Sequence, residues 1–136
     1  MLRILIGLLF CAVVSASGVE VEVSGIANQR GDVCLLVFSG EVGFPNDPEK
    51  AVAKFAVSAT KAKGGVVKFK IPGLKKGNYA FVALHDEDKD RKVKKNVFGI
   101  PKEGVAISNY PKLRPPKFEK AAVKNPGGIL RLRLSY

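Results

Sequence analysis

The segment HDEDKD, residues 85–90, places one histidine and three aspartates within six positions. Asp86, Asp88 and Asp90 alternate along the chain, and carboxylates at such spacing can supply oxygen ligands to a calcium ion from a loop. His85 is the only histidine of the chain, and a histidine beside carboxylates is also the arrangement of an acid–base catalyst. Two chemistries therefore arise from these residues, a metal site at Asp86, Asp88 and Asp90, and a small hydrolase that uses His85.

Neither pattern is complete. An EF-hand loop beginning at Asp86 needs glycine at its sixth position and glutamate at its twelfth, where this chain has Arg91 and Val97. Residues 86–95 contain four acidic and five basic side chains, and lysines near a cation site weaken it by repulsion or by occupying the carboxylates. We therefore favour a charge-paired hairpin tip that needs no cofactor, and keep Ca²⁺ as an alternative.

A second block, GIPKEG at residues 99–104, adds a carboxylate at Glu103. If this loop folds back over the end of the strand that His85 terminates, a polar site of His85, Asp86, Glu103 and Asn109 results. The same groups can instead satisfy the backbone of an ordered loop, and we favour that interpretation. Adjacent strand residues point to opposite faces, which argues against a His85–Asp86 dyad. We therefore predict that the protein is not an enzyme.

Short strands must position these residues. Apolar and polar residues alternate over 19–23, 67–71 and 130–136, as in half-buried strands, whereas 33–38 and 79–84 are apolar on both faces, as in central strands. Asp47 and Pro48 can begin one helical turn, or the segment can continue as a strand through residues 54–59. Frequent turn residues between strands favour an all-β, antiparallel β-sandwich of about seven strands.

The strand patterns at the two ends of the mature chain carry opposite charges on their outward faces, and these charges could pair if the two strands are neighbours in one sheet. Glu20 and Glu22 would then lie near Arg131 and Arg133, where cross-strand charge pairs fix register more than they stabilise the fold. Cys34 lies in the apolar run VCLLVF, and we expect it to be buried in the core as a free thiol.

The first 17 residues have the pattern of a signal peptide. Arg3 precedes an apolar run from Ile4 to Val14, and small residues surround position 16. The run is short for a membrane span. We therefore predict a signal peptide at 1–17, one β-sandwich domain at 18–136, a periplasmic or secreted location, and no membrane span after cleavage.

The net charge of +11 points to anionic partners. Lysines outnumber arginines and are not interleaved with aromatic residues, so nucleic acid is the least expected partner. An anionic component of the cell envelope or a protein partner remains, and the plain alternative is a basic surface that only keeps the protein soluble.

Three blocks resemble a known family, namely LKKGNYAFVALHDEDKD, NVFGIPKEGVAISN and PPKFEKAAV. They are similar to the exported bacterial family catalogued as domain of unknown function 2141 (DUF2141), over essentially the whole mature chain. The resemblance implies an Ig-like or transthyretin-like β-sandwich and no established activity. Family members more typically carry asparagine and glycine after the histidine–aspartate pair, where this chain has Lys89, Arg91 and Lys95. The function expected is a non-catalytic binding or accessory module of the cell envelope.

Overall fold

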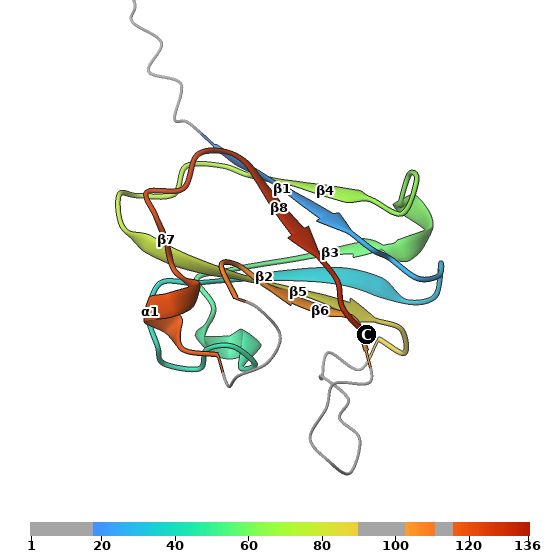
Figure 1. The fold of residues 1–136 in the computed structure, drawn as a ribbon, viewed down its shortest axis with the longest axis horizontal. Coiled ribbons are helices and arrows are strands. Elements are labelled where there is room, and N and C mark those ends of the chain that lie inside the picture. The colour runs from blue at the N-terminus through green and yellow to red at the C-terminus, as the bar shows by residue number, and fades with distance from the viewer. Residues whose placement is uncertain (1–17, 90–102, 111–115) are drawn as a thin grey trace, which may run out of the picture.

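The structure is a computed structural model that describes residues 18–89, 103–110 and 116–136. Two β-sheets lie face to face and enclose an apolar core (Figure 1). The predicted signal peptide at 1–17 and Asp90 of the predicted metal site lie outside the described residues. The all-β class predicted from the short alternating segments is confirmed.

The first sheet has three strands in the order β4–β1–β8. They are β4 (Val67–Ile71), β1 (Val19–Ser24) and β8 (Gly128–Arg133). Every second residue of β1 and β4 is buried, because alternate side chains of a strand point to one face. The terminal strands β1 and β8 are neighbours, which is the condition under which Glu22 can pair with Arg131, and they run parallel. The prediction of a wholly antiparallel sandwich was wrong here, since alternation defines the buried face of a strand and not its direction.

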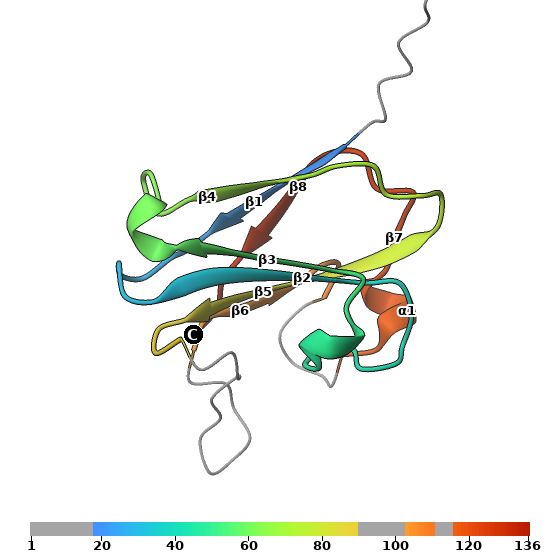
Figure 2. The ribbon, with the colours of Figure 1, turned by 180° about the vertical axis from the view of Figure 1, so that it is seen from behind.

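The second sheet contains five strands. They are β3 (Ala53–Ser58), β2 (Asp32–Phe38), β5 (Asn78–Asp86), β6 (Val105–Ile107) and β7 (Val123–Lys124). Their order is β3–β2–β5–β6, and β7 pairs with the start of β5. Figure 2 shows this sheet from behind, with β2 and β5 at its centre. The two segments that are apolar on both faces are therefore the central strands, as predicted.

The outer face of the central strands β2 and β5 is also largely buried. Cys34 is buried beside its core-facing neighbours. Phe38 packs edge-on against Phe44, which packs edge-on against Phe118 of helix α1 (Phe118–Ala121). The short strands β6 and β7 and the helix α1 were not specified by the sequence patterns.

Two 3₁₀ turns complete the described elements, η1 (Pro48–Lys50) and η2 (Ala59–Lys61). Asp47 caps η1 by accepting a hydrogen bond from the Glu49 amide, and β3 begins three residues after the turn ends. Both alternatives for this segment are thus realised in succession. None of the helices in the described residues has the length and apolar character needed to cross a bilayer.

Candidate functional site

The predicted site residues divide between two faces at the end of β5. The strand continues through Asp86, so His85 and Asp86 point to opposite sides of the sheet. His85 follows Tyr79, Phe81 and Ala83 on the face that encloses the core, whereas Asp86 points outward. Both side chains are fully buried. They therefore belong to two different polar environments.

On the inner face, both ring nitrogens of His85 have partners. Nε2 lies 2.7 Å from the carbonyl oxygen of Arg30, and Nδ1 lies 2.8 Å from the hydroxyl of Tyr136. A carbonyl oxygen can only accept, so Nε2 carries the hydrogen and a neutral ring leaves Nδ1 as an acceptor. The Tyr136 hydroxyl then donates to Nδ1 and accepts from the Ala27 amide at 3.0 Å. We call these four residues the His85 clasp: His85, Tyr136, Arg30 and Ala27.

The clasp joins the end of the chain to the loop before β2. Tyr136 packs its ring edge-on against His85 and closely against Gly104, where an added Cβ would lie 2.6 Å from the ring. Partial burial raises the pKa of Tyr136 above its usual value, and the negative charge of Glu87 raises it further. The hydrogen bond from the Ala27 amide lowers this pKa, but the net shift is upward. The phenol is therefore protonated at neutral pH, as its role as a donor requires.

Glu87, in the turn that follows β5, stabilises the loop that contributes Ala27 and Arg30 to the clasp. Its carboxylate accepts from the Asn28 side chain at 3.0 Å and from the Arg30 guanidinium at 3.1 Å. These bonds hold the loop of residues 28–31 against the end of β5. Gly31 permits this close approach because it has no Cβ: an added Cβ would lie 2.0 Å from the Asp86 carbonyl oxygen. Its φ of +67° is also a conformation that favours glycine.

On the outer face, three carboxylates converge. Ligand oxygens of Asp86, Asp88 and Glu103 all lie within 4.8 Å of one another; we call these residues the carboxylate cluster. Asp86 and Glu103 are buried and Asp88 is exposed. Asp32 stands directly opposite Asp86 on β2 and is 3.8 Å from the Lys89 ammonium. Like charges directly opposite each other in a sheet are unfavourable, so positive charge at this end of the sheet is stabilising.

The backbone places Glu103 on this side of the sheet. The His85 amide donates to the Gly104 carbonyl at 2.8 Å, and Val105 exchanges two hydrogen bonds of 3.0 Å with Ser135. The segment that contains Glu103 is therefore fixed against both β5 and the residues after β8.

The cluster has the chemistry and dimensions of a partial calcium site. Two oxygens bound to one Ca²⁺ at about 2.3–2.6 Å can be at most about 5 Å apart, and the 4.8 Å limit of the cluster satisfies this. Calcium takes six to eight oxygens, so three carboxylates supply only part of its coordination. The set fits a hard cation better than zinc, which prefers nitrogen and sulfur ligands.

Asn109 lies at the opposite end of β6 from Glu103. Its side chain donates to the Ala122 carbonyl at 3.2 Å. The neighbouring Ser108 is buried, accepts from the Phe81 amide and donates to the Ala121 carbonyl at 2.7 Å. The serine–asparagine pair therefore anchors α1 to β5 and does not reach His85.

The sequence patterns did not single out Tyr136 or Glu87 as site residues. The alternation over residues 130–136 predicts that Tyr136 shares one strand face with the leucines of that segment, which is the only signal the sequence offers. Its partner His85 lies 51 residues away, and nothing in local spacing connects the two. Glu87 was counted only among the charges of the predicted hairpin tip.

The fold and this site define an all-β protein in which one strand end separates a buried histidine clasp from a cluster of carboxylates. A family model matches residues 21–128, and the chain belongs to that family, described as an uncharacterized protein conserved in bacteria (DUF2141). The resemblance of the three sequence blocks is thereby confirmed. No curated protein and no solved structure matches the chain.

Proposed function

We propose that the protein is an exported, non-catalytic binding module that attaches to an anionic component of the cell envelope. The observation that carries this proposal is that most lysine side chains are exposed and make no ion pair. Among the lysines in the described residues, only Lys54, Lys68 and Lys89 make ion pairs, and the remaining ones are exposed. The excess positive charge is therefore presented to solvent, where it attracts anionic surfaces.

The surroundings of His85 support a non-catalytic role. A general base must reach the proton that it abstracts, but the His85 ring is buried and both nitrogens have partners. The hydrolase alternative would need the clasp to open. It would be supported if His85→Gln removed a hydrolytic activity of the native protein while preserving its melting temperature.

A binding panel tests the main proposal. The chain from residue 18 contains every strand of both sheets, so it holds the whole described core. We expect it to bind anionic lipid vesicles or an acidic polysaccharide at low ionic strength, and to release as salt shortens the Debye length from about 30 Å at 0.01 M to about 8 Å at 0.15 M. An absence of binding to every anionic surface at low salt would refute the proposal.

Export through a signal peptide at residues 1–17 is part of this proposal. The apolar run from Ile4 to Val14 supports it, as does the start of β1 at Val19, because cleavage before Gly18 removes no residue of either sheet. An Ig-like or transthyretin-like topology is proposed from the resemblance in sequence. Mass spectrometry of the protein from its host should find Gly18 or a neighbouring residue at the N-terminus; an intact Met1 would contradict cleavage.

A second candidate function, a calcium-stabilised structural domain, is favoured by the carboxylate cluster. Asp86, Asp88 and Glu103 would contribute oxygen ligands, and the bound ion would offset the repulsion between buried carboxylates. In this case the ion orders the end of β5 and performs no chemistry.

Thermal melts in calcium and in chelator test this second candidate. Calcium at one hundred times its dissociation constant would stabilise the fold by about 2.7 kcal/mol, which corresponds to roughly 10 °C for about 120 residues. Asp88→Asn should remove most of that shift, whereas Glu119→Gln, an exposed acidic residue on α1, should retain it. Identical curves with calcium and chelator would exclude the candidate.

A further inference from the structure

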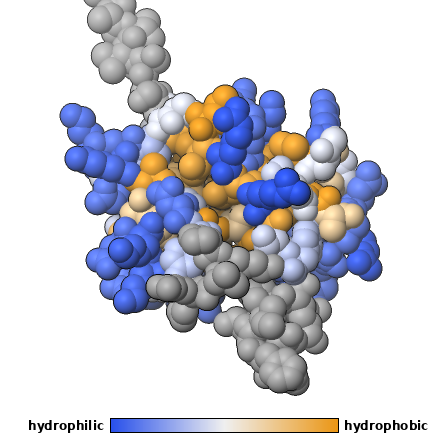
Figure 3. All heavy atoms as spheres, viewed as in Figure 1, coloured by the Kyte–Doolittle hydropathy of each residue, from blue (hydrophilic) through white to orange (hydrophobic). Residues whose placement is uncertain are grey.

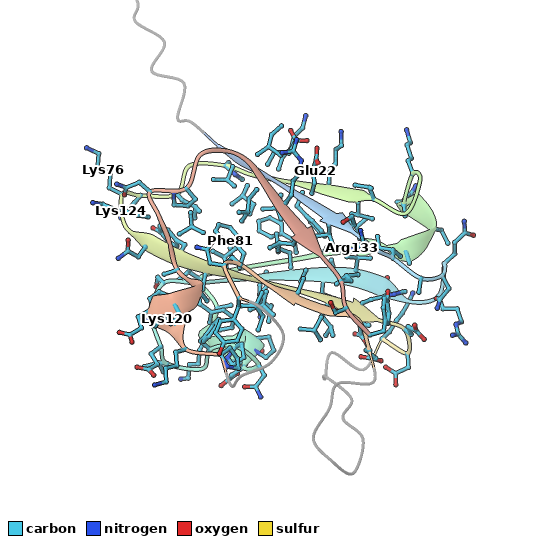
Figure 4. All side chains as sticks on the ribbon, viewed as in Figure 1. Glu22, Lys76, Phe81, Lys120, Lys124 and Arg133 are labelled. Carbon is cyan, nitrogen blue, oxygen red and sulfur yellow. The ribbon has the colours of Figure 1, made fainter. Side chains whose placement is uncertain are left out.

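Exposed lysines gather at the end of the sandwich where β5 begins. Lys75 and Lys76 lie in the turn between β4 and β5, and Lys124 lies in β7, directly opposite Asn78. The turn is tied to β7 because Asn125 and Gly77 exchange two hydrogen bonds of 2.7 Å. Figure 4 shows Lys76 and Lys124 projecting from this end. We call these three residues the lysine end: Lys75, Lys76 and Lys124.

The lysine end is electrostatically separate from the carboxylate cluster. No residue of the lysine end makes an ion pair within the described chain. The carboxylates gather at the other end of β5, whose nine residues span about 26 Å. This distance is about three Debye lengths at physiological salt, so the two ends act on partners independently.

An apolar hollow lies beside the lysine end. It opens where β1 and β8 begin and β4 ends, and Ile129 at its rim is 51% exposed. Apolar surface is visible near the start of β1, with hydrophilic residues around it (Figure 3). The hollow is connected to the lysines by short segments, from Pro72 to Lys75 and from Lys124 to Gly128. Its lining is mainly apolar, from Gly18, Val19, Ile71, Pro72, Gly128 and Ile129, and also includes the charged residues Glu20 and Lys70, which are paired across β1 and β4.

We infer that the lysine end and the adjoining hollow form a docking surface for an anionic phospholipid membrane. The lysines complement the lipid phosphates, and the exposed Ile129 side chain enters the apolar boundary of the headgroup region, the combination typical of peripheral membrane surfaces. The inference rests on the proposed function and deepens it by naming the partner and the surface. A membrane is favoured over an acidic polysaccharide because most of the hollow's lining is apolar and Ile129 is exposed at its rim.

Vesicle co-sedimentation of the chain from residue 18 tests the inference. The probes are vesicles of phosphatidylcholine alone and of phosphatidylcholine with phosphatidylglycerol. Each lysine near an anionic membrane surface contributes about fivefold to partitioning, so Lys76→Gln/Lys124→Gln should bind the anionic vesicles about 30-fold more weakly. The matched control is Lys61→Gln/Lys63→Gln, two exposed lysines between β3 and β4, which should bind within about threefold of the parent.

A further variant separates a membrane from a polyanion. Ile129→Ser should weaken binding to the anionic vesicles about fivefold, because an exposed apolar side chain no longer enters the bilayer, and should leave binding to a soluble acidic polysaccharide unchanged. Circular dichroism melts of each variant establish that the fold is intact.

Four results would overturn the inference. Equal losses from the two lysine pairs would show that binding depends on total charge and not on this surface. Equal binding to neutral and anionic vesicles would exclude recognition of phosphate. Binding to an acidic polysaccharide but to neither vesicle would refute the membrane surface while leaving the proposed envelope function standing; binding to no anionic surface would refute both.

Discussion

Removing the hydroxyl of Tyr136 tests the His85 clasp directly. In Tyr136→Phe the ring remains, but His85 Nδ1 loses the hydrogen bond of 2.8 Å that the hydroxyl donates. The ring of His85 is fully buried, so water does not readily replace the lost donor. A buried acceptor without a partner costs about 1–3 kcal/mol. The Ala27 amide also loses its acceptor, but Ala27 is exposed and water can replace it.

The expected free-energy change is large enough to measure by thermal or urea unfolding. For about 120 residues, 1 kcal/mol corresponds to roughly 4 °C in Tm, so Tyr136→Phe should lower Tm by about 4–12 °C. The matched control is Tyr79→Phe, which removes a hydroxyl that donates to the Lys75 carbonyl at 2.9 Å. Lys75 lies in an exposed turn, where water can take the place of the donor, so this variant should lose less than about 1 kcal/mol.

The comparison between Tyr136→Phe and Tyr79→Phe tests whether the Tyr136 hydroxyl donates a hydrogen bond to His85. If Tyr136→Phe destabilises the fold no more than Tyr79→Phe does, then the hydroxyl does not serve His85 as the geometry implies. A second readout is the chemical shift of the His85 ring nitrogens, which should report a hydrogen at Nε2 and an accepting Nδ1 in the parent protein. A hydrogen on Nδ1 at neutral pH would contradict the assignment of donor and acceptor.

Three further predictions concern the same end of the sandwich and the first sheet. Gly31→Ala should cost at least about 2 kcal/mol in urea unfolding, because alanine is strained at φ +67° and its Cβ would overlap the Asp86 carbonyl; a neutral result would mean that the loop has an alternative path. Glu22→Gln should cost no more than about 1 kcal/mol, since its two cationic partners in the first sheet are more than half exposed, and a larger loss would show that these pairs stabilise the fold as well as its register. Stability should decrease as pH rises above about 10, because the pKa of Tyr136 is raised in the folded protein and the unfolded chain releases that proton first; this alkaline loss should be smaller in Tyr136→Phe.

Local pattern was sufficient for most strands. The alternation of valine with glutamate over residues 19–23 gave the buried face of β1, and the two segments that are apolar on both faces became the central strands of the second sheet. These inferences succeed because side-chain direction follows from strand periodicity alone. The short strands β6 and β7 were not predicted, because two or three residues are too few to show a periodic pattern.

The candidate site could be predicted only in part. Strand periodicity indicated that His85 and Asp86 face opposite sides, and Glu103 was predicted to reach the end of β5 only if the GIPKEG block folds back over it. The structure joins Glu103 to Asp86 and Asp88, places His85 with Tyr136, and places Asn109 with α1. The four residues predicted to form one polar site, His85, Asp86, Glu103 and Asn109, thus belong to three environments.

The sequence by itself determined the all-β class, the central strands, the buried faces of β1 and β4 and the membership of the family. Tertiary structure alone decided the parallel pairing of β1 with β8, the bond between His85 and a tyrosine 51 residues away, and the gathering of lysines from a turn and from β7 at one end of the sandwich. The physical reason is that periodicity fixes the direction of a side chain relative to its own strand. The identity of its distant partner depends on how separate segments pack, and that is a property of the whole fold.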